Sequence, residues 1–266
     1  MNTATKLFMI IKQLVRKPWL LNKVLEAEDA WISYVSSKHG LRNGLPAIRA
    51  SQITGTFEGR VHPIAFLDGA SLPTDLLLLR LLAQKFNDCR YFEIGTWRGE
   101  SVANVAEVAG ECYTLNLSDE QMRSMGMNER YISLHRFFSR NLPNVVHLEG
   151  DSRNFDFSSL DKKFDLVFID GDHHYEMVKN DTEKVFRHLV HPGSIVVWHD
   201  YARNPETIRH EVLAGILDGA PAQYHGNIYY VENTLCAVYT AMNLPTREFE
   251  SPKSPGTYFD LTIKAD

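Results

Sequence analysis

The feature that most limits the possible folds is a regular alternation of strand-like and helix-like segments between residues 90 and 198. Short apolar segments of strand length alternate with longer segments that have helical periodicity. This alternation is typical of parallel βαβ units, with helices covering both faces of the sheet. We expect strands at residues 90–94, 111–117, 144–148, 164–169 and 194–198, and helices at residues 99–108, 130–138 and 175–189.

The pattern changes after Trp198. A helix is expected near residues 205–217, followed by two strand-like segments at 224–231 and 234–240. Only two residues separate these segments, and a link so short requires an antiparallel hairpin. The predicted fold class is therefore α/β. We expect a doubly wound, mostly parallel seven-stranded sheet with a terminal antiparallel hairpin and an N-terminal helical extension.

The part of the chain before residue 71 differs from the rest. Leu7, Ile10, Ile11 and Leu14 have helical spacing and predict an amphipathic helix, and the rhythm continues towards residue 35. Residues 40–70 lose periodicity and are rich in glycine and proline, as in lids and binding loops. We therefore divide the chain into residues 1–70 (helical extension and irregular lid or binding segment), 71–242 (the α/β domain) and 243–266 (extended tail).

Composition limits the environment and the partners. The net charge of -5 argues against a large nucleic-acid-binding face. The three cysteines lie in apolar surroundings without the close spacing of a zinc site, and we expect them to be reduced core thiols. No uncharged run approaches the ~20 residues of a membrane-spanning helix. We expect a cytoplasmic protein.

Two apolar segments end abruptly on carboxylate and imidazole groups. Asp170 and His173 follow the segment at 164–169, and His199 and Asp200 follow the segment at 194–198. In a parallel sheet the carboxyl ends of adjacent strands line one crevice. We expect these four side chains to lie close together, although an aspartate at a strand end can also simply cap the next helix.

The loop after the first expected strand reads Glu93-Ile-Gly95-Thr-Trp-Arg-Gly99. Gly95 permits a sharp turn and a close approach to a ligand, and Gly99 lets the next helix begin close to the sheet. Trp97 and Arg98 break the Gly-x-Gly-x-x-Gly spacing of dinucleotide-binding folds, which disfavours nicotinamide and flavin cofactors.

These features together resemble the class I S-adenosylmethionine (SAM)-dependent methyltransferases. The resemblance depends on the acidic-x-Gly-x-x-x-Gly loop, the Gly150-Asp151-Ser152 turn, the Asp170 strand end and the terminal hairpin, and it covers roughly residues 72–241. It implies a SAM-binding site. The cofactor-binding residues that it implies are Glu93, Gly95, Thr96, Gly99, Asn116, Asp151, Ser152 and Asp170.

Asn116 stands where the family usually has a carboxylate that holds the ribose hydroxyls. An amide can also hydrogen-bond a hydroxyl. Asp119 and Glu120 are alternatives for this role.

Within the superfamily, the Asp170, His173, His199 and Asp200 pattern resembles the metal-dependent O-methyltransferases, such as the catechol and macrolide-sugar enzymes. The resemblance implies that Asp170, His199 and Asp200 bind a metal, with Asp170 and His173 as catalytic residues and His173 as the general base. Oxygen ligands suit Mg²⁺, whereas an imidazole suits Mn²⁺, Fe²⁺ or Zn²⁺. The expected activity is O-methylation of a hydroxyl on a small molecule or sugar-containing metabolite with Mg²⁺ or Mn²⁺.

Two alternatives stay open at the level of sequence. Two histidines and one carboxylate can hold non-haem Fe²⁺, as in a hydroxylase. A non-catalytic binding module is also compatible, because residues 1–26 carry five basic side chains and one acidic side chain, as in helices that bind partners or membranes. Packing of this helix on the core or in a homodimer is favoured over membrane contact.

Overall fold

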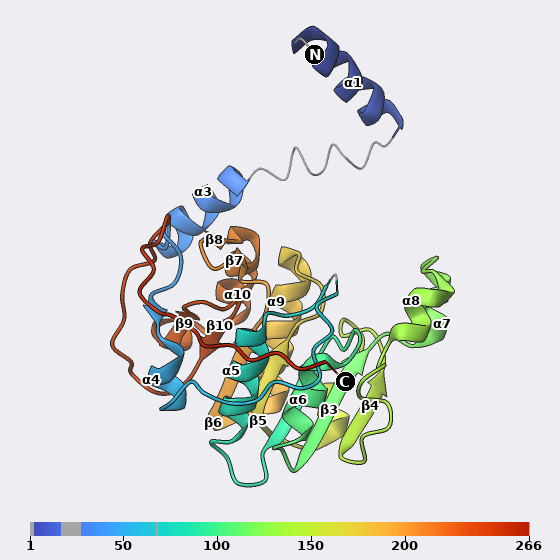
Figure 1. Cartoon of the computed structure of the whole chain (residues 1–266), viewed down its shortest axis with the longest axis vertical. Coiled ribbons are helices and arrows are strands. Elements are labelled where there is room, and N and C mark those ends of the chain that lie inside the picture. Colours follow the sequence, from blue (N-terminus) through green and yellow to red (C-terminus); the bar gives the residue numbers. More distant parts are fainter. Residues whose placement is uncertain (1–2, 17–27, 68, 266) are drawn as a thin grey trace.

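The computed structural model of the chain describes residues 3–16, 28–67 and 69–265 (Figure 1). Its centre is one mixed sheet, with the strand order β1-β9-β10-β6-β5-β2-β3-β4. The strands are β1 Ala47–Ile48, β2 Arg90–Ile94, β3 Glu111–Asn116, β4 Val145–Glu149, β5 Phe164–Ile169, β6 Val190–Trp198, β9 Ile228–Val231 and β10 Ala237–Tyr239.

The strand order confirms the predicted doubly wound fold. Strands β4, β3, β2, β5 and β6 are parallel, and β10 is antiparallel to both of its neighbours. From β2 the chain winds outward to β3 and β4 on one side and then returns to β5 and β6 on the other. The sheet has eight strands in the described part of the chain rather than seven. The extra strand is β1, a two-residue segment that pairs with β9 and was too short to show a periodic pattern.

Helices cover both faces of the sheet (Figure 1). Helices α5 (Pro73–Ala83) and α6 (Glu100–Ala106) bury leucine and valine side chains against one face, which includes Tyr91 of β2. Helices α9 (Tyr175–Lys184) and α10 (His210–Gly219) pack on the other face, which includes Phe92. Because successive strand residues point to opposite faces, β2 contributes to both hydrophobic cores.

The remaining helical segments are shorter or more peripheral. Helix α9 continues directly into the π-helical segment η2, and α3 packs against α10. The other segments are α1 Thr3–Arg16, α3 Glu28–His39, α4 Ala50–Thr54, α7 Asp119–Ser124, α8 Glu129–Leu134, η1 Phe157–Leu160, η2 Val185–Leu189 and η3 Ala222–Asn227.

Two predicted helices differ from the observed ones. The helix expected at 205–217 begins only at His210, because Pro205 lies in the turn of a small antiparallel pair, β7 (Ala202–Asn204) and β8 (Thr207–Ile208). The helix expected at 130–138 ends at Leu134, and turns follow it. In both segments local turn geometry takes precedence over apolar periodicity.

The N-terminal and C-terminal parts also have defined features. Helix α1 contains the residues Leu7 to Leu14 whose spacing predicted a helix, whereas the residues that continue the rhythm at 21–25 lie outside the described residues. In the tail, Arg247 pairs with Ala47 of β1. Within the described ranges, none of the helices combines the length and apolarity that crossing a membrane requires.

Candidate functional site

Four backbone hydrogen bonds align the ends of five strands, β2 to β6, at the carboxyl edge of the sheet. The amide of Gly95 donates to Leu115 O (2.9 Å), and the amide of Asp170 donates to Ile94 O (2.8 Å). The amides of Gly150 and His199 likewise donate to the ends of β3 and β5. The segments singled out from the sequence therefore meet at one edge, as predicted for a parallel sheet.

The loop between β2 and α6 contacts the end of β5 directly. Gly95 has φ 92°, and a Cβ atom at this position would lie 2.0 Å from the carbonyl oxygen of Asp170. Gly99 has φ 79°, and its Cβ would lie 2.3 Å from Ser139 Oγ. Only glycine fits these positions without a shift of its neighbours. Both glycines thus serve chain packing. This role was expected for Gly99, whereas Gly95 was expected to permit a sharp turn and the approach of a ligand.

Glu93 lies beneath this loop rather than at its surface. Its side chain is fully buried and accepts a hydrogen bond from Tyr91 Oη (2.6 Å). The Thr114 hydroxyl lies 3.4 Å from the carboxylate and also contacts the Thr96 hydroxyl. Burial raises the pKa of Glu93 to about 8, although hydrogen bonds from Tyr91 and Ser101 oppose the shift.

An aromatic cluster lies beside the same loop. The Trp97 ring stacks on Tyr131 of α8 with 4.1 Å between ring centroids, and His135 packs edge-on against both rings. Asn116, at the end of β3, places its amide nitrogen 3.1 Å from His135 Nδ1. Tyr131 and His135 were not predicted as site residues, because their segment lies beyond β3 and shows only a helical pattern.

The predicted turn after β4 lies next to Asn116 along the sheet edge. Asp151 forms an ion pair with Arg153 (2.5 Å), and Lys184 Nζ donates to the carbonyl oxygen of Ser152 (2.6 Å). Because Gly150 hydrogen-bonds Asn116 O, the structure brings the two predicted adenosine-binding segments together.

The donor atoms of Asp170, His199 and Asp200 all lie within 4.8 Å of one another. His199 Nδ1 is 3.1 Å from Asp170 Oδ1 and 3.6 Å from Asp200 Oδ2. This nitrogen is buried and makes no hydrogen bond of good geometry within the described part of the chain. A buried ring nitrogen that points between two carboxylates is the arrangement expected of a metal-binding histidine.

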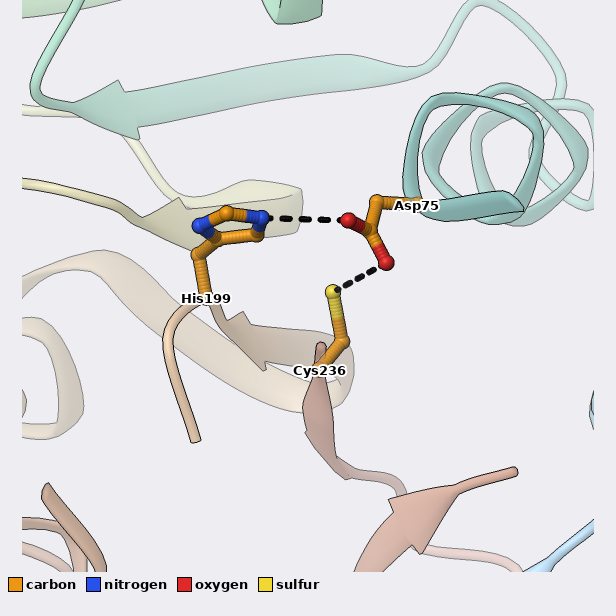
Figure 2. A group of neighbouring side chains, drawn as sticks. All are labelled: Asp75, His199 and Cys236. Carbon is orange, nitrogen blue, oxygen red and sulfur yellow. Dashed lines mark hydrogen bonds and ion pairs between the residues drawn. The ribbon is translucent and has the colours of Figure 1, made fainter. Parts of the chain in front are cut away.

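Asp75 holds the other side of the His199 ring (Figure 2). His199 Nε2 lies 3.2 Å from Asp75 Oδ2, and Asp75 Oδ1 accepts from the amide of Leu235 (2.8 Å) and contacts Cys236 Sγ. With Nε2–H donated to Asp75, Nδ1 faces the two carboxylates, and a bound cation would replace the proton that this nitrogen carries in the metal-free protein. Carboxylates commonly orient metal-binding histidines in this way.

Asp75 has a second role at the start of α5. Its Oδ2 accepts a hydrogen bond from the amide of Leu72 (2.8 Å), which caps α5, and the side chain is fully buried. No signal in the sequence connects Asp75 to His199, 124 positions further along the chain.

The electrostatics of the cluster favour a bound cation. Three carboxylates, Asp75, Asp170 and Asp200, surround His199, and Arg209 Nη2 lies 3.3 Å from Asp200 Oδ1. With a neutral imidazole, three carboxylates and one guanidinium leave an excess of two negative charges, which matches a divalent ion.

The pKa shifts follow from burial and these contacts. Burial opposes protonation of His199, but the surrounding carboxylates outweigh it and raise its pKa well above the usual value. Burial also raises the pKa of Asp170. For Asp200, burial is outweighed by the close contact with His199 and by attraction to His199 and Arg209, and the pKa falls to about 2.

His173 lies at the rim of the cluster. Its Nδ1 is 3.9 Å from Asp200 Oδ2, and half of its side chain is exposed. Its neighbour His174 bonds Asp172 (2.6 Å) and directly precedes α9. His173 therefore faces the crevice from outside, while His199 is built into its floor.

Part of the predicted lid segment packs beside the loop between β2 and α6. Asn104 of α6 accepts from the amide of His62 and donates to the carbonyl of Pro63, both at 2.8 Å. Glu100 accepts from the amide of Ala65 (2.6 Å). Phe66 follows with an exposed side chain, and the carbonyl oxygen of Leu67 accepts a hydrogen bond from Arg98 of the loop that begins at Gly95 (3.4 Å). These bonds fix residues 62–65 over the start of α6.

Comparison with known proteins agrees with the class that this fold and site define. Residues 92–201 match a family model described as a methyltransferase domain. The match covers the glycine loop, the strand end at Asp170 and the His199-Asp200 pair. Together with the strand order, it confirms the resemblance to class I SAM-dependent methyltransferases.

Individual proteins are similar to the chain at low identity. The uncharacterized protein R132 of Acanthamoeba polyphaga mimivirus is 25% identical over 179 residues, which cover 59% of this chain and 76% of the relative.

Among solved structures, the O-methyltransferase from Bacillus cereus in complex with SAH is 17% identical over 80% of this chain and 99% of that chain (TM-score 0.43). SAM-bound CalS10, an amino pentose methyltransferase from Micromonospora echinaspora, is 18% identical over 47% of each chain (TM-score 0.34). The chain thus spans about half the length of CalS10.

Proposed function

We propose that this protein is a SAM-dependent methyltransferase that methylates a hydroxyl group of a small molecule, with a divalent cation bound by Asp170, His199 and Asp200. The observation that carries the proposal is the contact between the two halves of the site. Gly95 of the donor loop lies directly against the backbone of Asp170, so a methyl donor and a cation would sit side by side.

The ligand set suits a cation of intermediate hardness. Two carboxylates and one imidazole favour Mn²⁺ or Fe²⁺ over Mg²⁺, although Mg²⁺ also accepts carboxylates. When bound, the cation would lower the pKa of the acceptor hydroxyl. Asp75 and Arg209 would keep the ligands oriented, because they hold His199 and Asp200 from outside the cluster.

His173 is our candidate for the base that takes the hydroxyl proton. Its exposed imidazole lies at the mouth of the crevice, within 3.9 Å of Asp200. The remaining work of the chain is positioning, since methyl transfer from a sulfonium needs an aligned acceptor rather than a covalent intermediate. We assign the acceptor-binding role to residues 62–67, which belong to the segment 40–70 expected to form a lid or binding loop, and to the loops after β6.

The donor-binding assignment follows the carboxyl edge of the sheet. Gly95, Thr96 and Gly99 would approach the donor, with Asn116 near the ribose and Asp151 and Ser152 near the adenine. Glu93 would support this loop from below, because its carboxyl group is buried against Tyr91. Trp97 and Tyr131 offer a stacked aromatic surface beside the loop.

The iron-hydroxylase alternative receives no comparable support. A two-histidine, one-carboxylate set would require His173 to join His199. In the described residues, the cluster of donor atoms contains one histidine and two carboxylates.

Calorimetric titration of the metal-free protein with SAM, alone and after addition of Mn²⁺ or Mg²⁺, tests the proposal. We expect micromolar binding of SAM and a separate metal titration that Asp170→Asn weakens at least tenfold. The matched control is Asp172→Asn, which removes a nearby carboxylate outside the ligand set. Absence of SAM binding under all conditions would refute the donor assignment.

A further inference from the structure

The N-terminal helix α1 has two chemically different sides. Its apolar side consists of Leu7, Phe8, Ile10, Ile11, Leu14 and Val15, and all of these except Leu14 are more than half exposed. The opposite side carries Lys6, Lys12 and Arg16 and no acidic residue. An exposed apolar stripe of this width on a single helix usually marks a surface that binds something.

The charge of this helix contrasts with that of the chain. The protein has a net charge of -5, yet α1 carries three positive charges and no negative charge. Figure 1 shows α1 as a helix outside the two layers that cover the sheet. Among the described contacts, the basic residues of α1 form no ion pair with the acidic residues of the rest of the chain.

We propose that α1 binds the surface of an anionic phospholipid bilayer, lying in the plane of the interface. The apolar side would enter the boundary between headgroups and acyl chains, and the basic side chains would face the phosphate groups. Lysine and arginine suit this position, because their long side chains reach the headgroups while their stems stay in apolar surroundings. This inference is independent of the proposed catalytic function.

The dimensions of α1 argue against other occupants. A helix of 14 residues is about 21 Å long, too short to span a bilayer. A coiled coil with a second copy requires three or more heptads and a narrow apolar seam, whereas α1 holds two heptads and a wide apolar side. Pairing of two copies through their apolar sides would also leave the basic side chains without anionic partners, whereas an anionic surface neutralises them.

Co-sedimentation of the full-length protein with vesicles tests this inference. We expect binding to vesicles of phosphatidylcholine with phosphatidylserine, weak binding to pure phosphatidylcholine, and release by salt. Replacing both Lys6 and Lys12 with glutamine should weaken binding to the anionic vesicles by about 30-fold, since each basic residue contributes ~1 kcal/mol near such a surface.

Two substitutions of an apolar residue by glutamine test whether vesicle binding depends on the apolar side of α1 or only on the overall hydrophobicity of the helix. Ile11→Gln removes an apolar residue from the middle of the stripe and should reduce vesicle binding at least tenfold. Met9→Gln is the control, because Met9 lies on the basic side of the helix. This variant should bind vesicles as the unchanged protein does.

Three results would overturn the inference. The first is a lack of binding to anionic vesicles at low salt, and the second is equal binding by Ile11→Gln and Met9→Gln. The third is a concentration-dependent dimer, detected by light scattering without vesicles, that Ile11→Gln abolishes, because a second copy would then be the occupant.

Discussion

Replacing Asp75 with asparagine should weaken metal binding without touching a metal ligand. The two oxygens of Asp75 have different partners. Oδ2 accepts from the Leu72 amide and from His199 Nε2, and Oδ1 accepts from the Leu235 amide. Asparagine has only one side-chain oxygen, so in either orientation its NH₂ group faces at least one buried N–H donor.

The magnitude follows from which donor loses its partner. An unsatisfied buried donor costs about 1–3 kcal/mol of folding free energy. If the asparagine NH₂ faces His199, the ring must change tautomer to accept from it. Nδ1 then carries the proton and its lone pair is no longer available for a cation. Loss of such an orienting partner typically lowers metal affinity about 10- to 100-fold.

Calorimetric titration with Mn²⁺, together with urea unfolding of the metal-free protein, checks both parts. Asp172→Asn is the matched control, because Asp172 contacts His174 and not His199. We expect Asp75→Asn to lose both affinity and stability and the control to lose neither. A loss of stability with unchanged Mn²⁺ affinity would show that Asp75 only caps α5, and would refute the reasoning.

Three further predictions concern the donor loop. Because the folded-state pKa of Glu93 is about 8, above its ordinary 4.5, its contribution to stability is complete below pH 4.5 and is lost as the pH rises towards 8. Between pH 5 and pH 8, the free energy of unfolding of Glu93→Gln should therefore fall by about 3 kcal/mol less than that of the unchanged protein. Identical pH profiles of the two proteins would contradict the burial argument. Gly95→Ala should lower both the unfolding temperature and SAM affinity, since its Cβ meets the Asp170 carbonyl; a fully stable variant would contradict this contact. Gly99→Ala should destabilise by about 1–3 kcal/mol, and Ser139→Gly should restore part of the loss by removing the Oγ and Cβ that the new methyl group meets; no recovery would leave backbone strain at φ 79° as the whole cause.

The sequence predicted the sheet well because its information is local. All five parallel strands were expected from apolar runs of strand length, and two of them, at residues 90–94 and 164–169, have their expected bounds. The antiparallel pair β9 and β10 followed from the short link between them. Strand β1 was missed, because two residues show no period, and it exists only through pairing with β9.

The candidate site also has a part that could be predicted from the sequence and a part that could not. Asp170, His199 and Asp200 were predicted to meet because each directly follows a parallel strand, and this placement depends on topology alone. The groups that adjust their chemistry were not predicted. Arg209 and Asp75 come from other elements, and their contacts with Asp200 and His199 depend on tertiary packing.

The contact between Asp75 and the distant residue 199 matters because residue 199 is a histidine. An oxygen ligand needs no fixed tautomer, but an imidazole binds a cation only through a nitrogen that carries no proton. The chain directs the cation to Nδ1 by holding Nε2–H with a buried carboxylate on α5, which the amide of Leu235 before β10 holds in place. A change in the packing of α5 or of the β9–β10 hairpin would therefore reach the metal site through Asp75, without altering any residue that contacts the cation.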